Sequence, residues 1–375
     1  MRIGYFIGNL GMSGGVKVLL QHVRLLRELG HDALLLTKRI VYDWADIADN
    51  AVILREDLLD MPECDLYVAT VASEVSTLYR SKGAKVAHLC QGYEPEEYGA
   101  RIRGESVTER YRATGPFSFL KRAANNLRFR KRIRRFEATY ALPTVKMAVS
   151  RHLADLIEKR YGQRCFLVQN GVDHRVFYPG VGYARVGALP GPVRVLSTGS
   201  IHVGFKGIPD TLEAIRILKD RGRPVELTRV SPGPPSEGER RSAIVDRFLI
   251  AISEQEMAAL YRETDIFISS SLEGEGFGLP AIEALLSGVP CVLTEISTYN
   301  NFSDSRDFAY FVPMHRPEAI ADGIMTLINE GSIRNRCIER GLEVAKTFSL
   351  ERTKDHLAAF VEEISRGIRE MKKGR

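Results

Sequence analysis

Short apolar runs alternate with longer segments of helical spacing, and this alternation limits the chain to α/β folds. The run Ile3–Ile7 is followed by Val16–Leu29, whose apolar residues lie on one helical face, and then by a second run, Ala33–Thr37. Gly30 stands where a helix ends in a left-handed residue. Runs that are apolar throughout are typical of parallel strands covered by helices on both faces. Further strands are expected at Ala51–Leu54, Asp65–Val71, Lys85–Leu89 and Val145–Val149.

The alternation stops at Tyr178 and starts again at Val193. The stretch between them is rich in glycine and proline and has neither helical nor strand period, as in an interdomain linker. We therefore expect two doubly wound α/β domains, 1–178 and 193–350, joined by a linker at 179–192. A C-terminal helix follows at 351–375, and packing against the first domain is one arrangement for it. Ligands bind beyond the carboxyl ends of parallel strands, so two facing domains would share one cleft. In the second domain strands are expected at Val193–Leu196, Val225–Val230, Phe248–Ile250, Ile266–Ser269 and Pro290–Leu293, and helices at Pro209–Asp220, Glu254–Glu263, Pro280–Ser287, 317–330, 333–346 and 350–371.

The most informative segment runs from Glu275 to Glu283 and follows the expected strand Ile266–Ser269. Gly276 and Gly278 let the backbone approach a ligand closely, and the helix that opens near Pro280 offers its positive end to a diphosphate. The carboxylates of Glu275 and Glu283, one on each side of this turn, could accept hydrogen bonds from sugar and ribose hydroxyls. The segment therefore predicts a site for a sugar–diphosphate–nucleoside. The alternative is a tight turn with solvent-exposed glutamates.

Two more glycine-rich loops connect a strand to a helix. Lys206 stands in the loop from Gly199 to Gly207, where a flexible ammonium could meet the charge of a leaving diphosphate. A solvated surface lysine is the alternative. The first loop, Gly8–Gly15, lacks the dinucleotide spacing, and no acidic residue closes the following strand. We interpret it as a flexible wall of the cleft.

Together these segments resemble glycosyltransferase family 4, whose members are retaining enzymes of the GT-B fold. The resemblance rests on Gln169-Asn170-Gly171-Val172-Asp173, on Gly199 with Lys206-Gly207, and on Glu275 to Glu283 as an E-x7-E motif. It implies that Glu283 binds the ribose, Glu275 the donor sugar and Lys206 the diphosphate. Lys206 and Glu275 are thus the candidate catalytic residues. The donor-binding candidates are Gly14, Gly15, Gly199, Gly207, Gly276, Phe277, Gly278, Leu279 and Glu283. The chain has no Asp-x-Asp sequence, so the resemblance implies a metal-independent reaction without a resident cofactor, in which a nucleotide-diphosphate sugar is the co-substrate.

Two positions depart from the family pattern. Ser200 stands where the family usually has an arginine, so the diphosphate would have one positive partner fewer unless another basic residue substitutes. A family histidine on the first domain's side of the cleft is best matched by Gln91, which can still hydrogen-bond a sugar. His88 is the other catalytic candidate there. A histidine inside an apolar strand is more often a core residue.

Positive charge is concentrated between Arg101 and Tyr140, which hold twelve Lys or Arg against three Glu. Residues 117–140 have helical spacing. We weigh an interfacial patch for anionic lipid or acceptor, formed by Lys121, Arg122, Arg128 and Arg132, against a core helix with a solvated outer face. The sequence contains no nucleic-acid recognition module, so nucleic acid is not an expected partner.

The five cysteines are scattered singly, no segment is a signal peptide, and none is long enough to span a bilayer. We expect a cytoplasmic protein, and peripheral association with the inner face of the membrane is the arrangement that the basic segment would allow. The expected function is hexosyl or deoxyhexosyl transfer to a glycan or lipid-linked acceptor in cell-surface polysaccharide or glycoconjugate synthesis. The alternatives are a non-catalytic nucleotide-sugar-binding protein and a nucleotide-sugar epimerase. No second carboxylate is evident in Gly8–Gly15, so retention by front-face attack is expected.

Overall fold

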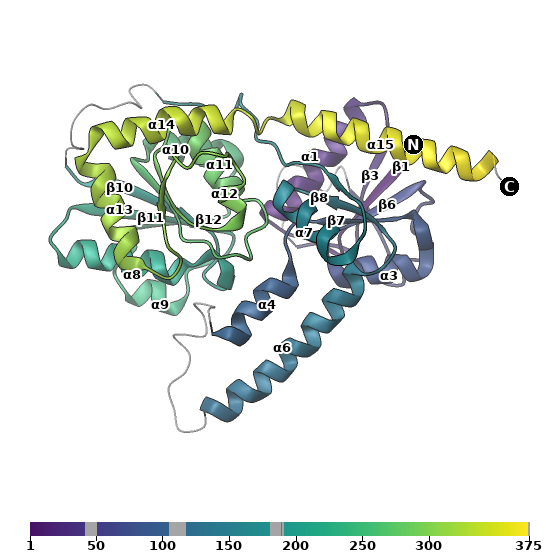
Figure 1. The fold of residues 1–375 in the computed structure, drawn as a ribbon, viewed down its shortest axis with the longest axis horizontal. Helices are drawn as coiled ribbons and strands as arrows, with labels where there is room; N and C mark the ends of the chain where they lie inside the picture. The colour runs from purple at the N-terminus through teal and green to yellow at the C-terminus, as the bar shows by residue number, and fades with distance from the viewer. Residues whose placement is uncertain (42–50, 105–117, 181–188, 190, 374–375) are drawn as a thin grey trace. The chain divides into compact units, whose positions relative to one another are not determined.

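Two parallel sheets with helices around them make up the computed structural model, which describes residues 1–41, 51–104, 118–180, 189 and 191–373 (Figure 1). The chain divides into two compact units. Unit 1 contains Met1–Tyr93, Arg134–Gly171 and Leu350–Arg375, and unit 2 contains Glu94–Ile133 and Val172–Ser349. The expected α/β class, with two doubly wound sheets, is confirmed. Most of the expected linker 179–192 lies outside the described residues.

The sheet of unit 1 has seven parallel strands. Their order is β5 (Ala51–Ile53), β3 (Asp32–Thr37), β1 (Arg2–Phe6), β6 (Leu66–Ala69), β7 (Val86–Cys90), β8 (Val145–Ala148) and β9 (Cys165–Leu167). Its helices are α1 (Gly14–Glu28), α3 (Ala72–Lys82), α7 (Arg151–Tyr161) and α15 (Leu350–Lys373), with a 3-10 turn at Gly83–Lys85. A two-stranded sheet pairs β2 (Asn9–Leu10) with β4 (Arg39–Ile40).

The sheet of unit 2 has six parallel strands. Their order is β12 (Arg247–Ile250), β11 (Val225–Ser231), β10 (Val193–Thr198), β13 (Ile266–Ser269), β14 (Cys291–Thr294) and β15 (Tyr310–Val312). A 3-10 turn, η2 (Gly204–Lys206), precedes the first helix. The helices are α8 (Ile208–Asp220), α9 (Glu237–Arg241), α10 (Glu254–Glu263), α11 (Leu279–Leu286), α12 (Ser297–Asn300), α13 (Pro317–Asn329) and α14 (Gly331–Ala345).

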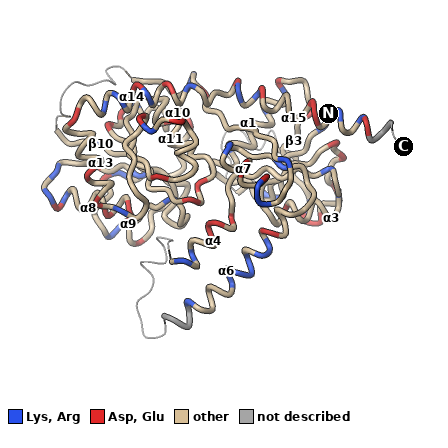
Figure 2. The backbone as a smooth tube through the Cα atoms, in the orientation of Figure 1, with Lys and Arg blue, Asp and Glu red and all other residues tan. Residues whose placement is uncertain are grey.

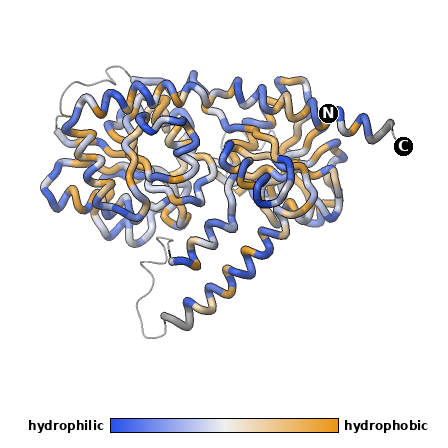
Figure 3. Tube along the Cα trace, in the orientation of Figure 1, coloured by the Kyte–Doolittle hydropathy of each residue, from blue (hydrophilic) through white to orange (hydrophobic). Residues whose placement is uncertain are grey.

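Local sequence explains where several helices begin. Ser13 accepts a hydrogen bond from the Val16 amide at 3.2 Å and so caps α1, and Ser253 forms a complete capping box with Glu256 at the start of α10. The strands are apolar because both faces of each sheet are covered, and the apolar colour of Figure 3 follows them. The candidate residues follow the ends of these buried strands, in the segments that lead to the helices.

Several expected boundaries differ from the structure, three of them near the candidate residues. Gly14 and Gly15 are not loop residues, because the cap at Ser13 makes them the first turn of α1. The expected strand Asp65–Val71 is shorter, since Val71 is already the N-cap of α3. Pro280 is the second helical residue of α11, after Leu279, so the helix starts closer to Gly278.

α15 belongs to unit 1. Its side chains Leu357, Phe360 and Val361 are buried, and the Phe360 ring meets Phe166 of β9 at a centroid distance of 5.2 Å. His356 accepts a hydrogen bond from the Gln169 amide at 3.1 Å. The helix therefore completes the core of a unit whose first strand lies at the other end of the sequence.

Candidate active site

The two central strands of the second sheet, β10 and β13, bring the main candidate residues together. From β10 the chain continues to β11 and β12 on one side, and from β13 to β14 and β15 on the other, so the sheet has its topological switch point between them. Ligands of open α/β sheets bind at such a point, beyond the carboxyl ends of the strands. Lys206 follows β10 and Glu275 follows β13. Their side chains meet, with Lys206 Nζ 2.6 Å from Glu275 Oε2.

Glu275 is held firmly in this position. The residue is buried, and Oε2 also accepts a hydrogen bond from Ser271 Oγ at 3.1 Å. Its backbone carbonyl accepts from Thr298 Oγ1, at the start of α12. Lys206 keeps about a fifth of its side chain exposed, at 22%. The pair therefore offers an accessible ammonium beside an oriented carboxylate.

Glu283 lies in α11, one turn beyond the helix start, and is buried. The hydroxyl of Tyr261 lies 3.3 Å from Glu283 Oε2 and 2.9 Å from the Pro280 carbonyl. Burial, and secondarily the negative charge of Glu283, raise the pKa of Tyr261, so this hydroxyl stays protonated and can donate. Tyr261 therefore orients the carboxylate, a contact that the sequence did not suggest.

The segment before α11 is packed too tightly for side chains at its glycines. Gly278 has φ +82°, and a Cβ there would lie 2.5 Å from the ring of Tyr299. Phe277 is buried in an aromatic cluster with Phe302 and Phe348, and Leu279 is buried as well. Phe277 and Leu279 can therefore meet a donor only through their backbone.

The loop that carries Lys206 is equally restricted. Gly207 has φ +62°, and a Cβ there would lie 1.8 Å from the carbonyl oxygen of Ser270. The Ser270 hydroxyl donates to the Gly207 carbonyl at 2.8 Å. Gly199 has φ +117°, and the aliphatic stem of Lys206 packs over it, 3.1 Å from where its Cβ would be. These two glycines therefore determine the backbone path of the loop and the direction in which the Lys206 side chain extends.

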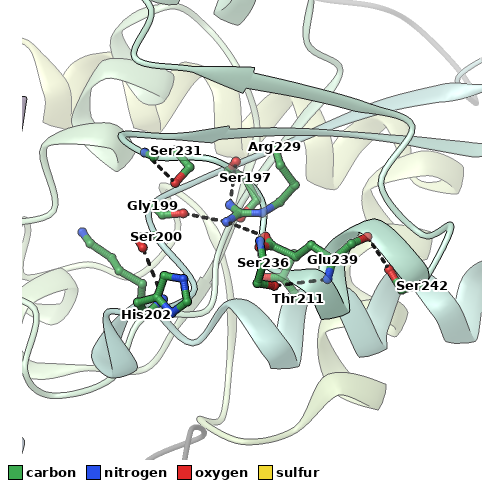
Figure 4. Close-up of polar contacts among 12 residues, drawn as sticks. Ser197, Gly199, Ser200, His202, Thr211, Arg229, Ser231, Ser236, Glu239 and Ser242 are labelled. Carbon is green, nitrogen blue, oxygen red and sulfur yellow. Dashed lines mark hydrogen bonds and ion pairs between the residues drawn. The ribbon is translucent and has the colours of Figure 1, made fainter.

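A buried arginine also forms hydrogen bonds to the backbone at the start of the loop from Gly199 to Gly207 (Figure 4). Arg229, in β11, is fully buried and donates to the carbonyls of Gly199 at 2.6 Å and Ser197 at 3.0 Å. Burial lowers its pKa to about 10, against the opposing effect of Glu239, which lies 3.5 Å away. Arg229 is thus a buried positive charge that contacts the backbone of Gly199, the residue before Ser200. The sequence reasoning missed it because its neighbours are far away along the chain.

In unit 1, two side chains hold the ends of the Gly8–Gly15 segment. Gln91, directly after β7, donates to the Gly15 carbonyl at 3.2 Å. Glu74, in the first turn of α3, accepts from the Gly8 amide at 2.7 Å. Residues 8–15 themselves contain no carboxylate, as the sequence shows, and Glu74 reaches the segment from the neighbouring strand end.

His88 lies inside β7, as its position in an apolar run predicts. It is fully buried, its ring lies 4.7 Å from that of Tyr140, and burial lowers its pKa to about 3. Neither ring nitrogen has a hydrogen-bond partner among the described residues. The structure therefore favours the core alternative for His88 over the catalytic one.

The basic segment forms α4 (Glu94–Arg103) and α6 (Ser118–Tyr140), and Figure 2 shows the positive residues along α6. Arg132 donates to the Tyr98 hydroxyl at 2.8 Å and lies over its ring, so it joins the two helices. Arg122 and Arg128 are exposed, as is Leu127 at 72%. Residues 105–117 and the Lys121 side chain lie outside the description. Arg132 is exposed and thus combines a packing contact with a place on the surface.

No described helix is long and apolar enough to cross a membrane. Within the same residues, no group of three or more His, Cys, Asp or Glu side chains could hold a metal ion.

Comparison with known proteins gives the family context. Residues 192–330 match the model of the family described as glycosyl transferases group 1. The phosphatidyl-myo-inositol mannosyltransferase of Mycobacterium leprae is 25% identical over 170 residues, which cover 44% of each chain. The chain thus matches a little under half the length of this curated relative.

Solved structures match over nearly the whole chain. WaaG, a glycosyltransferase involved in lipopolysaccharide biosynthesis, aligns with a TM-score of 0.70 and 14% identity, covering 96% of this chain and 99% of that one. HepE of Anabaena, solved in complex with UDP-glucose, aligns with a TM-score of 0.68 and 15% identity, covering 97% and 100%. At this identity the likeness shows the fold alone, and that fold is GT-B.

Proposed function

We propose that the chain is a retaining glycosyltransferase of family 4, which transfers a hexosyl or deoxyhexosyl group from a nucleoside-diphosphate sugar to a glycan or lipid-linked acceptor. The observation that carries the proposal is the contact between Lys206 and Glu275 at the switch point of the second sheet. The residues that match the glycosyl transferases group 1 model, 192–330, include both partners and Glu283, which supports it.

The donor would bind along this edge of the second sheet. The amide groups at the start of α11 receive the diphosphate, since a helix start carries partial positive charge. Glu283, oriented by Tyr261, takes the ribose hydroxyls. Lys206 supplies the mobile positive charge, so the reaction needs neither a metal ion nor a resident cofactor. Arg229 holds the Gly199 carbonyl and thereby the course of the loop.

The transfer step would proceed on one face of the donor sugar. The bond from the anomeric carbon to the phosphate oxygen breaks, the acceptor oxygen bonds to the same face, and the acceptor proton passes to the leaving phosphate oxygen. Lys206 stabilises the charge that grows on that oxygen, an interaction stronger in the transition state than before it. Glu275 orients the sugar hydroxyls and does not attack the anomeric carbon.

The test is a transfer screen with defined probes. UDP-glucose, UDP-N-acetylglucosamine and GDP-mannose serve as donors, and myo-inositol phosphate, phosphatidylinositol vesicles and short mannose or glucose oligosaccharides as acceptors. Release of nucleoside diphosphate that depends on an acceptor, with NMR of the product's anomeric proton, measures both transfer and stereochemistry. An inverted product would contradict the family assignment. A trapped glycosyl–Glu275 adduct would overturn the front-face mechanism alone.

Lys206→Met has a matched control in the same unit. Lys219, in α8, pairs with Asp246 at 2.8 Å and has a similar exposure of 25%. We expect Lys206→Met to lower kcat on the order of 10²-fold with little change in donor KM, and Lys219→Met to change neither. A raised KM at unchanged kcat would show that Lys206 only holds the donor.

Two alternatives predict other outcomes of the same screen. A nucleotide-sugar-binding protein without activity would be stabilised by a donor and release no diphosphate with any acceptor. An epimerase would convert the donor sugar without an acceptor. The ion pair of Lys206 with the carboxylate favours transfer, since it places a cation where a leaving diphosphate needs one.

A cytoplasmic location with peripheral contact at the inner face of the membrane belongs to the same proposal. Its support is the basic surface of α6 beside the exposed Leu127. Each basic residue near an anionic surface contributes about 1 kcal/mol. Arg128→Glu with Lys131→Glu should weaken binding to phosphatidylglycerol vesicles, whereas Arg366→Glu with Arg369→Glu, the same charge change on the exposed side of α15, should not. Equal binding by both double variants would refute the contact.

A further inference from the structure

The first sheet has its own topological switch point, between β1 and β6. From β1 the chain continues to β3 and β5 on one side, and β6 begins the run to β7, β8 and β9 on the other. Gly8 follows β1, and Glu74 follows β6 in the first turn of α3. Glu74 therefore stands at the edge where ligands of such sheets bind.

One oxygen of Glu74 fixes the backbone at Gly8. Oε1 accepts from the Gly8 amide at 2.7 Å, and a Cβ on Gly8 would lie 2.8 Å from the same oxygen, so a side chain there would require the carboxylate to shift. The Gly8 carbonyl is held as well, by the amides of Lys38 at 3.2 Å and Arg39 at 3.1 Å. The backbone at Gly8 is thus bound from both sides.

Of the two residues that follow Gly8, Asn9 has a polar side chain and Leu10 an apolar one. Leu10 is fully buried and pairs with Ile40 in the small sheet of β2 and β4. Asn9 lies between these two anchors and is exposed. Asn9 itself pairs with Arg39 in that sheet, so the hydrogen bond from Gly8 to Glu74 is one of several anchors that set the position of Asn9.

The second oxygen of Glu74 differs from the corresponding oxygen of Glu275. Oε2 is inaccessible to solvent and has no hydrogen-bond partner among the described residues. Glu275 has Lys206 and Ser271 at its Oε2, whereas no cation in the described part of the chain forms an ion pair with Glu74.

The charged group that faces Glu74 from the end of β3 is Lys38, whose ammonium is paired with Glu56 at 3.1 Å. The segment Gly8–Leu10 contributes no titratable side chain. Burial therefore prevails and raises the pKa of Glu74 to about 7, against the lowering effects of the Gly8 amide and Lys38.

We infer that Glu74 is a positioning residue for the acceptor: its hydrogen bond to Gly8 holds Asn9 where an acceptor hydroxyl binds. The inference rests on the proposed transferase and deepens its acceptor side. The acceptor class is a polyol, since an amide side chain both donates to and accepts from hydroxyl groups. A hydrogen bond to a carboxylate is stronger than one to a neutral carboxyl, so the hold on Gly8 weakens as the pH falls through the pKa of Glu74.

The test measures acceptor KM, donor affinity and their pH dependence, with the donor and acceptor that the transfer screen selects. For the wild type, acceptor KM should rise about fivefold from pH 8 to pH 6, while the affinity for nucleoside diphosphate stays constant. Glu74→Gln keeps an oxygen for the Gly8 amide but cannot ionise. It should show, at every pH, the acceptor KM that the wild type has at low pH. Glu74→Leu should raise acceptor KM further without pH dependence, and Asn9→Ala should raise it too.

Glu63→Gln is the matched control, because Glu63 is a carboxylate that contacts the last turn of the same helix, through Lys82 at 3.1 Å. It should leave acceptor KM and its pH profile unchanged. A readout independent of transfer is the amide signal of Gly8 in protein labelled with ¹⁵N-glycine. That signal should titrate near pH 7 in the wild type and not in Glu74→Gln.

The outcomes distinguish the role of Glu74 from the proposed transferase activity. Normal transfer by Glu74→Leu with a wild-type acceptor KM would overturn the inference alone. So would a Gly8 signal that does not titrate, or a loss confined to donor affinity. Absence of transfer by the wild type with every probe would overturn the proposed function, and the acceptor role with it.

Discussion

The contact between Lys206 and Glu275 can be weighed by a double-mutant cycle on stability. Removing one partner of a buried ion pair costs about 3–5 kcal/mol, because the other charge stays buried without compensation. Glu275 is 8% exposed, but Lys206 is 22% exposed at its side chain and Ser271 still donates to Oε2. We therefore expect Lys206→Met to lower the free energy of unfolding by about 2–3 kcal/mol, somewhat less than for a fully buried pair.

The other variants follow from the same argument. Glu275→Gln leaves an ammonium that still reaches water and should cost about 1 kcal/mol. The double variant removes both charges, so it should cost about as much as Glu275→Gln alone, with a coupling energy of about 2 kcal/mol. Lys219→Met removes a pair whose carboxylate, Asp246, is 38% exposed, and should cost less than about 1 kcal/mol.

Thermal unfolding followed by calorimetry is the assay. For a unit of this size 1 kcal/mol shifts Tm by about 2–4 °C, so Lys206→Met should lower the Tm of the second unit by roughly 5–10 °C. The transition of that unit is identified as the one that nucleoside diphosphate raises. Equal shifts for Lys206→Met and Lys219→Met, or strictly additive effects in the double variant, would refute the reasoning.

Three further predictions test single features. Gly207→Ala should lower the free energy of unfolding, measured with urea, by about 3 kcal/mol or more, because its Cβ would lie 1.8 Å from the Ser270 carbonyl oxygen. Gly222→Ala, at a similar φ of +69° but in open space, should lower it by about 1 kcal/mol. Tyr261→Phe should cost about 1–2 kcal/mol and weaken nucleoside diphosphate binding severalfold in calorimetric titration, since Glu283 loses a donor; unchanged affinity would remove Tyr261 from the site. Glu74→Gln should gain stability relative to the wild type as the pH rises from about 4.5 to about 7, by up to about 3 kcal/mol, because the wild-type carboxyl must ionise in a buried place; a pH-independent difference would contradict the raised pKa.

Much of the second unit could be predicted from local sequence. The helix Glu254–Glu263 and the strand Ile266–Ser269 lie at the residues expected, because the serine cap at Ser253 and a short apolar run define them without help from the rest of the fold. Short elements were missed. Neither the two residues of β2 nor the three of β9 contain enough sequence to show a period, and they form only because a partner strand is present.

The candidate site was predictable as a set of positions but not as a set of contacts. Glu275, Glu283 and Lys206 could be found because glycines and strand ends mark them. Arg229 and Glu74 could not, since nothing next to them in the sequence distinguishes them from other buried or surface charges. Their importance comes from a strand or loop about 30 and 66 residues away, respectively.

Unit 1 is built from three separate stretches of sequence, so it can complete its fold only after the last stretch has been synthesised. Its first strand leaves the ribosome early, yet α15, which covers part of its core, is synthesised only after the whole body of unit 2. At about 5–20 residues per second the interval is on the order of ten seconds or more. During that time the part of the unit 1 core that later contacts Leu357, Phe360 and Val361 is exposed to solvent. The second unit can thus fold first, and chaperones that bind nascent apolar surface should be found on the first unit.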